Sequence, residues 1–244
     1  MINKTKLVDF IGKYYLNGLT EDVKYTIKDK TMNVQFKTFN RDVIGSITSP
    51  IDLDDAEFAI TDSSPFLKLL NILDKDIQIE YQSEYGIIEK LLIEDNQYKM
   101  LFVLGDISQV KPVERAIDGI SFNLTYNIEP DFSTKFIECK KALGSEIKTF
   151  QLIVKEDNKA KIILGDPSGY ANKLEFEIDV NYEGFPFEID LNSDIVKEIL
   201  VANKNYTSGE MRINPNGLFQ LYFVEDDVTS MYSIPVNNEN NLPL

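Results

Sequence analysis

The chain has 244 residues, a length typical of one large domain or of two domains of ordinary size. Its 43% hydrophobic and 27% charged residues indicate a globular protein with a real core, and its apolar runs are too short to span a bilayer. Histidine is absent, so the commonest general base and metal ligand is missing. The formal net charge of −15 argues against phosphate binding by the chain as a whole, since that depends on lysine and arginine.

Cellular location is predicted by two further features. The single cysteine excludes an internal disulfide and fits a reducing compartment. The first residues contain no signal-peptide core. We therefore expect a cytoplasmic protein with no membrane association.

The first half of the chain predicts two helices and a series of antiparallel strands. Residues 4–17 have helical apolar spacing, with Leu7, Phe10, Ile11 and Tyr14 on one face and Gly18 as the stop. The segment Asp62-Ser-Ser-Pro begins a second helix, predicted over 64–75. Apolar alternation predicts strands at 23–28, 32–37, 43–47, 56–60, 76–81, 87–93 and 98–104.

Proline, glycine and mixed charge without a clear period mark residues 107–119 as a connector. We accordingly predict an N-terminal domain at 1–107, a connector at 108–120 and a C-terminal domain at 121–244. The second half then repeats the first, with helices at 129–144 and 194–204. Further strands are expected at 122–128, 150–155, 160–164, 173–180, 185–190, 209–213, 218–224 and 229–234. The predicted fold class is α+β: two similar domains, each with two helices packed on antiparallel sheet.

The helix at 129–144 has an apolar stripe of Phe132, Phe136, Cys139 and Leu143. Asp131 is its predicted N-cap, and Gly144 is expected to end it in the left-handed conformation. We interpret Cys139 as core filling rather than a reactive thiol.

Lysines are concentrated on the four predicted helices. The segments 4–17, 64–75, 132–143 and 193–204 contain ten lysines and five acidic residues, a charge of +5 that leaves −20 for the rest of the chain. A shared phosphate-facing surface would explain this distribution, whereas the plainer alternative is that solvated helix faces favour lysine. The candidate phosphate-facing residues are Lys4, Lys6, Lys13, Lys68, Lys75, Lys135, Lys140, Lys141, Lys197 and Lys204.

Six segments carry a resemblance to a known protein family: Thr5 to Ile11, Gly45 to Leu53, Phe58 to Leu73, Asp131 to Leu143, Phe150 to Lys155 and Met231 to Val236. With two similar α+β domains and lysine-bearing helices, joined by a connector, the chain resembles the DNA polymerase sliding clamps. The resemblance is greatest to the clamps of T-even-like tailed bacteriophages and extends more distantly to proliferating cell nuclear antigen. It covers nearly the whole chain but contains no invariant motif.

The resemblance implies a ring-forming subunit: a homotrimer that encircles double-stranded DNA without sequence preference, with the helix lysines touching phosphates. It implies no enzymatic activity and no cofactor, and it implies DNA polymerase and a clamp loader as partners in the cytoplasm of a bacterial host. It also implies an apolar partner pocket beneath the connector, whose alternative is ordinary packing of a connector on its own domain. Matching positions are Ile107, Val110, Val113, Ile117, Tyr232, Ile234 and Pro235.

Other functions remain as alternatives. A non-enzymatic phage structural or adaptor protein could use the same helices for subunit contacts. An enzyme acting through carboxylates is disfavoured by the absence of histidine and of any convergent motif. Residues 179–190 have the ligand spacing of a calcium loop, but strands are predicted on both sides, so we interpret them as a hairpin turn with no metal.

Overall fold

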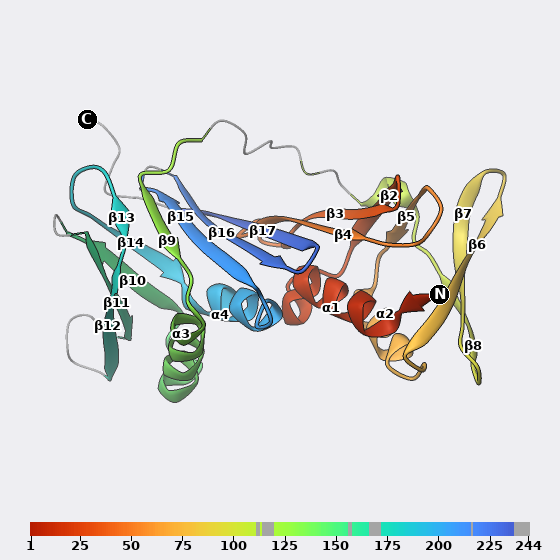
Figure 1. Ribbon diagram of the computed structural model, residues 1–244, viewed down its shortest axis with the longest axis horizontal. Helices are drawn as coiled ribbons and strands as arrows, with labels where there is room; N and C mark the ends of the chain where they lie inside the picture. The colour runs from red at the N-terminus through yellow and green to blue at the C-terminus, as the bar shows by residue number, and fades with distance from the viewer. Residues whose placement is uncertain (111–112, 114–119, 156–157, 166–171, 216, 237–244) are drawn as a thin grey trace. The chain divides into compact units, whose positions relative to one another are not determined.

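The computed structural model of the chain describes residues 1–110, 113, 120–155, 158–165, 172–215 and 217–236 (Figure 1). It divides into two compact units. Unit 1 consists of Met1–Ala116 and Asp226–Ser230, and unit 2 of Ile117–Glu225 and Met231–Leu244. No helix in the described part of the chain has the length and apolar character needed to cross a membrane.

Unit 1 contains the helices α1 (Lys4–Tyr15) and α2 (Ser63–Leu70) and two antiparallel sheets. One sheet has the strand order β1-β6-β7-β8, and the other contains the run β4-β3-β2-β5. The hairpin predicted at 23–28 and 32–37 is confirmed, and its register pairs Tyr25 with Val34. The strands are β1 (Ile2–Asn3), β2 (Val23–Lys28), β3 (Thr31–Lys37), β4 (Ile44–Pro50), β5 (Ala56–Ile60), β6 (Asp76–Glu84), β7 (Ile87–Glu94) and β8 (Lys99–Val103).

The apolar stripe of α1 forms the centre of unit 1, as predicted: Leu7, Phe10, Ile11 and Tyr14 are all buried. Asn3 begins the helix, because its side-chain oxygen accepts the backbone N–H groups of the first turn. The helix stops earlier than predicted: the residue after Tyr15 already has left-handed backbone angles.

The second helix is also shorter than predicted. It ends at Leu70 rather than at residue 75. Its start is held by Glu21, whose carboxylate accepts the backbone N–H of Ser64 at 3.0 Å and whose carbonyl accepts the Ser63 hydroxyl at 2.7 Å. Figure 1 shows α1 and α2 side by side, next to strands β2 to β5.

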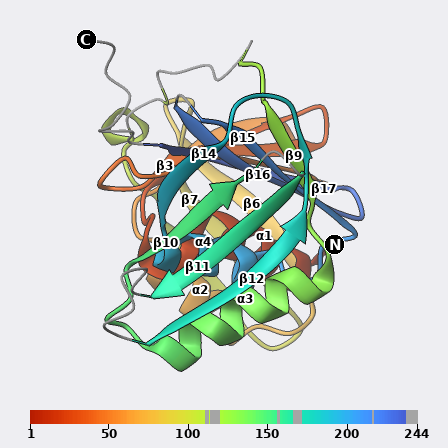
Figure 2. The same ribbon diagram turned by 90° about the vertical axis from the view of Figure 1, so that its left-hand side faces the viewer.

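Unit 2 contains the helices α3 (Pro130–Leu143) and α4 (Ser193–Ala202). One sheet has the order β12-β11-β10-β14, and the other contains the run β13-β9-β15-β16-β17. Figure 2 shows β10, β11 and β12 side by side, with α3 next to them. The strands are β9 (Leu124–Asn127), β10 (Thr149–Val154), β11 (Lys159–Gly165), β12 (Lys173–Asp179), β13 (Asn181–Tyr182), β14 (Phe187–Asn192), β15 (Ser208–Asn214), β16 (Leu218–Glu225) and β17 (Val228–Pro235).

Only half of the apolar stripe predicted for α3 is buried, since Cys139 and Leu143 are half-buried. Phe132 and Phe136 are buried, and the ring of Phe136 meets that of Phe150 edge to face at 5.0 Å between centroids. The predicted cap at Asp131 is wrong: Glu129 is the N-cap, because Pro130 already occupies the first helical position. Gly144 has a positive φ of 79°, but its ψ of −173° is extended rather than left-handed helical.

The predicted α+β class is confirmed, with two helices and antiparallel sheets in each unit. The two-residue strands β1 and β13 were not predicted, because a pair of residues carries no readable alternation.

Candidate nucleic-acid interface and partner pocket

Each unit packs its two helices against each other and against a sheet. In unit 1, α1 contacts α2 and β4; in unit 2, α3 contacts α4 and β11, and α4 contacts β10. The remaining face of each helix is therefore available to solvent. Of the ten predicted DNA-facing lysines, six are exposed: Lys6, Lys68, Lys75, Lys135, Lys141 and Lys204.

Two more of the ten are half-buried and held by their own unit. The ammonium group of Lys4 donates a hydrogen bond to the carbonyl of Leu73, beyond the end of α2. Lys197 lies 2.6 Å from the carboxylate of its neighbour Glu198, which cancels its charge locally. Neither side chain extends freely from its helix, so both are weaker candidates for phosphate contact than the exposed six.

The expectation that Lys13 and Lys140 lie on the surface is wrong. Each is only 3% exposed. Lys140 comes four residues after Phe136, so it shares the buried face of α3. Its ammonium lies 2.8 Å from the carboxylate of Asp194 and donates to the carbonyl of Gly144 at 3.1 Å. This lysine ties α3 to the start of α4 and does not reach the solvent.

Asp194 forms ion pairs with two lysines. Besides Lys140, the exposed Lys148 lies 3.4 Å from its second oxygen. Burial raises the pKa of the Asp194 carboxyl, but the hydrogen bonds and charges of Lys140 and then Lys148 outweigh it, so the pKa lies below its ordinary value of 3.8. Lys148 is an exposed basic residue that the helix periodicity did not identify, because it lies between α3 and β10.

The structure reduces the basic excess of the helices. Lys75 and Lys204 lie beyond the ends of α2 and α4, so the four helices contain eight lysines and five acidic residues, a charge of +3. Lys135 lies 3.8 Å from Asp131 on its own helix, an exposed pair that contributes little. Any attraction of these helices for phosphate is therefore weak.

No protein-family model and no curated protein matches the chain by sequence. Among solved structures, proliferating cellular nuclear antigen (PCNA) from Entamoeba histolytica matches with a TM-score of 0.76 at 10% identity, over 97% of this chain and 96% of that one. PCNA from Thermococcus kodakaraensis matches with a TM-score of 0.75, and the PCNA2–PCNA3 complex from Sulfolobus tokodaii with 0.73. For both, the identity is 11% and the cover is 97% of this chain and 98% of the other. The chain has the PCNA fold.

The residues predicted to line a partner pocket differ in exposure. Tyr232 is fully buried, and its hydroxyl accepts the side-chain amide of Asn203 at 2.9 Å. Ile234 is 4% exposed, and only Pro235 beside it is open to solvent. Tyr232 and Ile234 therefore belong to the core of unit 2. Ile107, Val110 and Val113 are half-buried, and Ile117 lies outside the described residues.

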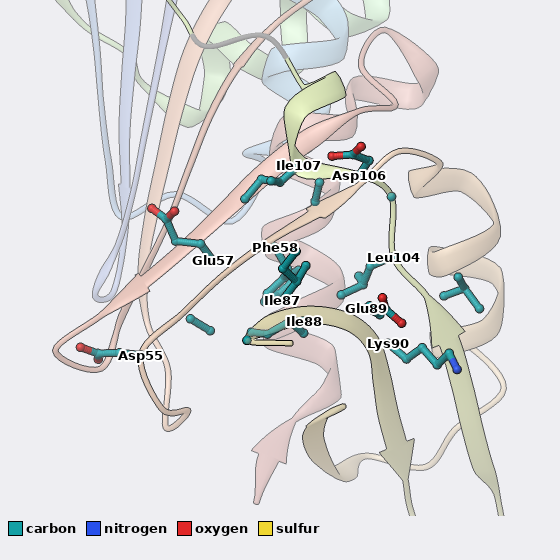
Figure 3. Close-up of a pocket in the computed structure, with 15 residues that line it drawn as sticks. Asp55, Glu57, Phe58, Ile87, Ile88, Glu89, Lys90, Leu104, Asp106 and Ile107 are labelled. Atoms are coloured by element: carbon teal, nitrogen blue, oxygen red, sulfur yellow. The ribbon is translucent and has the colours of Figure 1, made fainter. Parts of the chain in front are cut away.

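A cavity of about 760 Å³ in unit 1 of the PCNA fold includes one of these residues, Ile107 (Figure 3). Its other walls come from β5, from the start of β7 and from the residues that follow β8. Figure 3 shows Phe58 and Ile87 near its centre, with Glu57 on one side and Glu89 on the other. Sequence reasoning did not identify this cavity, because its walls come from three separate segments, 55–59, 86–90 and 103–107, whose approach depends on the sheet topology.

Proposed function

We propose that the chain is the subunit of a DNA sliding clamp, a non-enzymatic ring that encircles duplex DNA and tethers a replicative DNA polymerase. The observation that carries the proposal is the likeness to PCNA structures over 97% of the chain, with both helix pairs included. The clamp family that the sequence resembles works by this means.

Weak, sequence-blind contact with phosphate suits such a ring. The six exposed lysines are on or next to the helices, while the rest of the chain is strongly acidic. A ring is retained on DNA by topology, so its inner face needs only mild attraction, and mild attraction permits sliding. A chain with a net charge of −15 can therefore act on DNA.

We propose that three copies close the ring through two strand edges. In the part of the chain that the structure describes, β8 and β12 are each the last strand of their sheet, so each presents an unpaired backbone edge there. Leu101 on β8 is 50% exposed, and Leu174 on β12 is 39% exposed. Pairing β8 of one copy with β12 of the next buries these side chains and makes a head-to-tail contact of the kind that closes into rings.

The finer identity is proposed from the sequence resemblance. It favours a clamp of a T-even-like bacteriophage, loaded by a clamp loader in the cytoplasm of the bacterial host. The connector between the domains proposed at 1–107 and 121–244 would then lie next to the polymerase-binding surface.

Mass in solution tests the ring. Light scattering on a gel-filtration column, over a dilution series, should show a species of three times 27.9 kDa. A mass of 27.9 kDa at every concentration would contradict the proposed trimer.

Replacing Lys6, Lys68, Lys135 and Lys141 together with glutamate separates the clamp from the alternative structural or adaptor protein. The clamp should keep its assembled mass and lose its association with DNA, because these side chains face DNA rather than another subunit. A structural protein that uses the helices for subunit contacts would instead lose its assembly.

A further inference from the structure

The cavity of unit 1 has an open strand edge as one wall. β5 ends its sheet, and in the part of the chain that the structure describes its outer edge is met by the single bridge between Ala59 and Gly105. The N–H of Gly105 donates to the carbonyl of Ala59 at 3.1 Å. Backbone groups of a strand alternate in direction, so the N–H and C=O of Glu57 point the same way as that carbonyl. They face the cavity and can pair with another strand.

The floor of the cavity is apolar. Phe58 is 5% exposed, and its ring stacks on that of Tyr25 with 5.0 Å between centroids, so it is a rigid part of the core. Ile87 and Val103 also line the cavity, and they are 64% and 66% exposed. Large apolar side chains exposed to this degree around a hollow are typical of a binding surface.

The rim of the cavity is acidic. Its lining contains four carboxylates, from Asp55, Glu57, Glu89 and Asp106, and one lysine, Lys90. Lys24 lies 2.9 Å from the Glu57 carboxylate, which still leaves an acidic excess around the opening. Such a rim repels phosphate, and it attracts lysine and arginine.

We propose that this cavity binds an extended, basic segment of a partner protein, which adds as a strand to the outer edge of β5. Alternate side chains of the segment point to opposite faces, so apolar ones pack on Phe58, Ile87 and Val103 while the lysine or arginine residues between them approach Glu57 and Glu89. A second copy of this chain is a poor occupant, because its open edge strand β12 presents Glu175, Glu177 and Asp179 to an acidic rim.

The surface is formed by unit 1 alone, so the inference does not depend on the ring. The probe is a fluorescein-labelled peptide, Lys-Val-Lys-Ile-Lys-Val-Lys, with blocked ends, and binding is measured by fluorescence anisotropy at low and high salt. A peptide with the four lysines first and the three apolar residues last has the same charge without the alternation. The alternating peptide should bind tighter than this control, and high salt should weaken it.

Two variants with matched controls locate the site. Glu89→Lys should lower the affinity for the alternating peptide by about threefold or more, and Ile87→Ser should lower it by about fivefold. Glu80→Lys makes the same charge change on β6 of the same sheet, and Ile72→Ser changes an isoleucine that is 60% exposed just after α2. Both controls lie outside the cavity and should change binding by less than about twofold.

Amide shifts in the NMR spectrum of the full chain should be confined to residues 55–59, 86–90 and 103–107. Several results would overturn the proposal. One is that the alternating peptide does not bind, and another is that the two peptides bind equally. The others are that the control variants lose as much affinity as the cavity variants, or that the amide shifts lie outside these three segments. The mass measurement tests the ring by itself, so failure of one proposal leaves the other intact.

Discussion

Lys140 and Lys141 are adjacent in α3, yet replacing each with methionine should have opposite consequences. Lys140 is 3% exposed, and its ammonium lies 2.8 Å from Asp194 and 3.1 Å from the Gly144 carbonyl. Lys141 is exposed. Methionine retains most of the aliphatic stem in both variants, so the comparison isolates the two ammonium groups.

The cost of Lys140→Met follows from these contacts. A hydrogen bond to a charged group contributes about 1.5–3 kcal/mol. Removing the ammonium also relieves its own desolvation, which offsets part of the loss. Asp194 is 40% exposed and retains Lys148 at 3.4 Å, so it is not left as an isolated buried charge. We expect Lys140→Met to lower the free energy of unfolding by about 2 kcal/mol, and Lys141→Met to change it by less than about 0.5 kcal/mol.

Urea unfolding followed by circular dichroism measures the free energy of unfolding of both variants. The salt dependence of DNA association measures whether each lysine contributes to DNA binding. Lys141→Met should weaken DNA association and reduce its salt slope, because an exposed cation is lost. Lys140→Met should leave DNA association unchanged under conditions where the protein is folded. Equal unfolding free energies for the two variants, or a DNA defect confined to Lys140→Met, would refute the assignment of Lys140 as a structural residue.

Three further predictions rest on other contacts. Asp194→Asn should lower the free energy of unfolding by about 1 kcal/mol near pH 7, a value discounted for solvent screening because the pair is partly exposed. The folded state lowers the pKa of this carboxyl, so the greater stability of the wild type should hold above the ordinary pKa of 3.8 and disappear as the pH falls below it. Urea titrations at several pH values measure this difference. Tyr232→Phe should lower the unfolding free energy by about 1 kcal/mol, because the Asn203 amide loses a buried acceptor. The same variant should leave polymerase binding unchanged. Lost polymerase binding without lost stability would restore Tyr232 as a partner residue. Leu101→Arg on the β8 edge should give a folded 27.9 kDa monomer in light scattering, whereas Ile72→Arg should remain assembled; a trimer in both would place the contact elsewhere.

The sequence predicted the elements of the fold well wherever one period persisted over several residues. The alternation at 23–28 and 32–37 and the stripe of Leu7, Phe10, Ile11 and Tyr14 both correspond to observed burial. Ends of elements were predicted less well, because they depend on single contacts. The first turn of α2, for example, is held by Glu21, more than 40 residues away.

The candidate lysines show a different limit. A signal for Lys140 was present, since Phe132, Phe136 and Lys140 are spaced by four and share one helix face. Its partner Asp194 is more than 50 residues away, and no local pattern indicates that α3 and α4 meet there. Without knowledge of its counter-ion, a lysine on an apolar helix face is therefore predicted to be exposed. The cavity of unit 1 was missed for the same reason, because sheet topology assembles it.

Encirclement of DNA is tested most directly by comparing retention on circular and linear duplexes. The protein is incubated with a nicked circular plasmid at a concentration where it is assembled, and the mixture is passed through a gel-filtration column at high salt, before or after cutting with a single-site nuclease. A ring should co-elute with the circular plasmid and be lost from the linear one, because topology rather than charge retains it. Equal retention on both forms, or release from both at high salt, would contradict the sliding-clamp account.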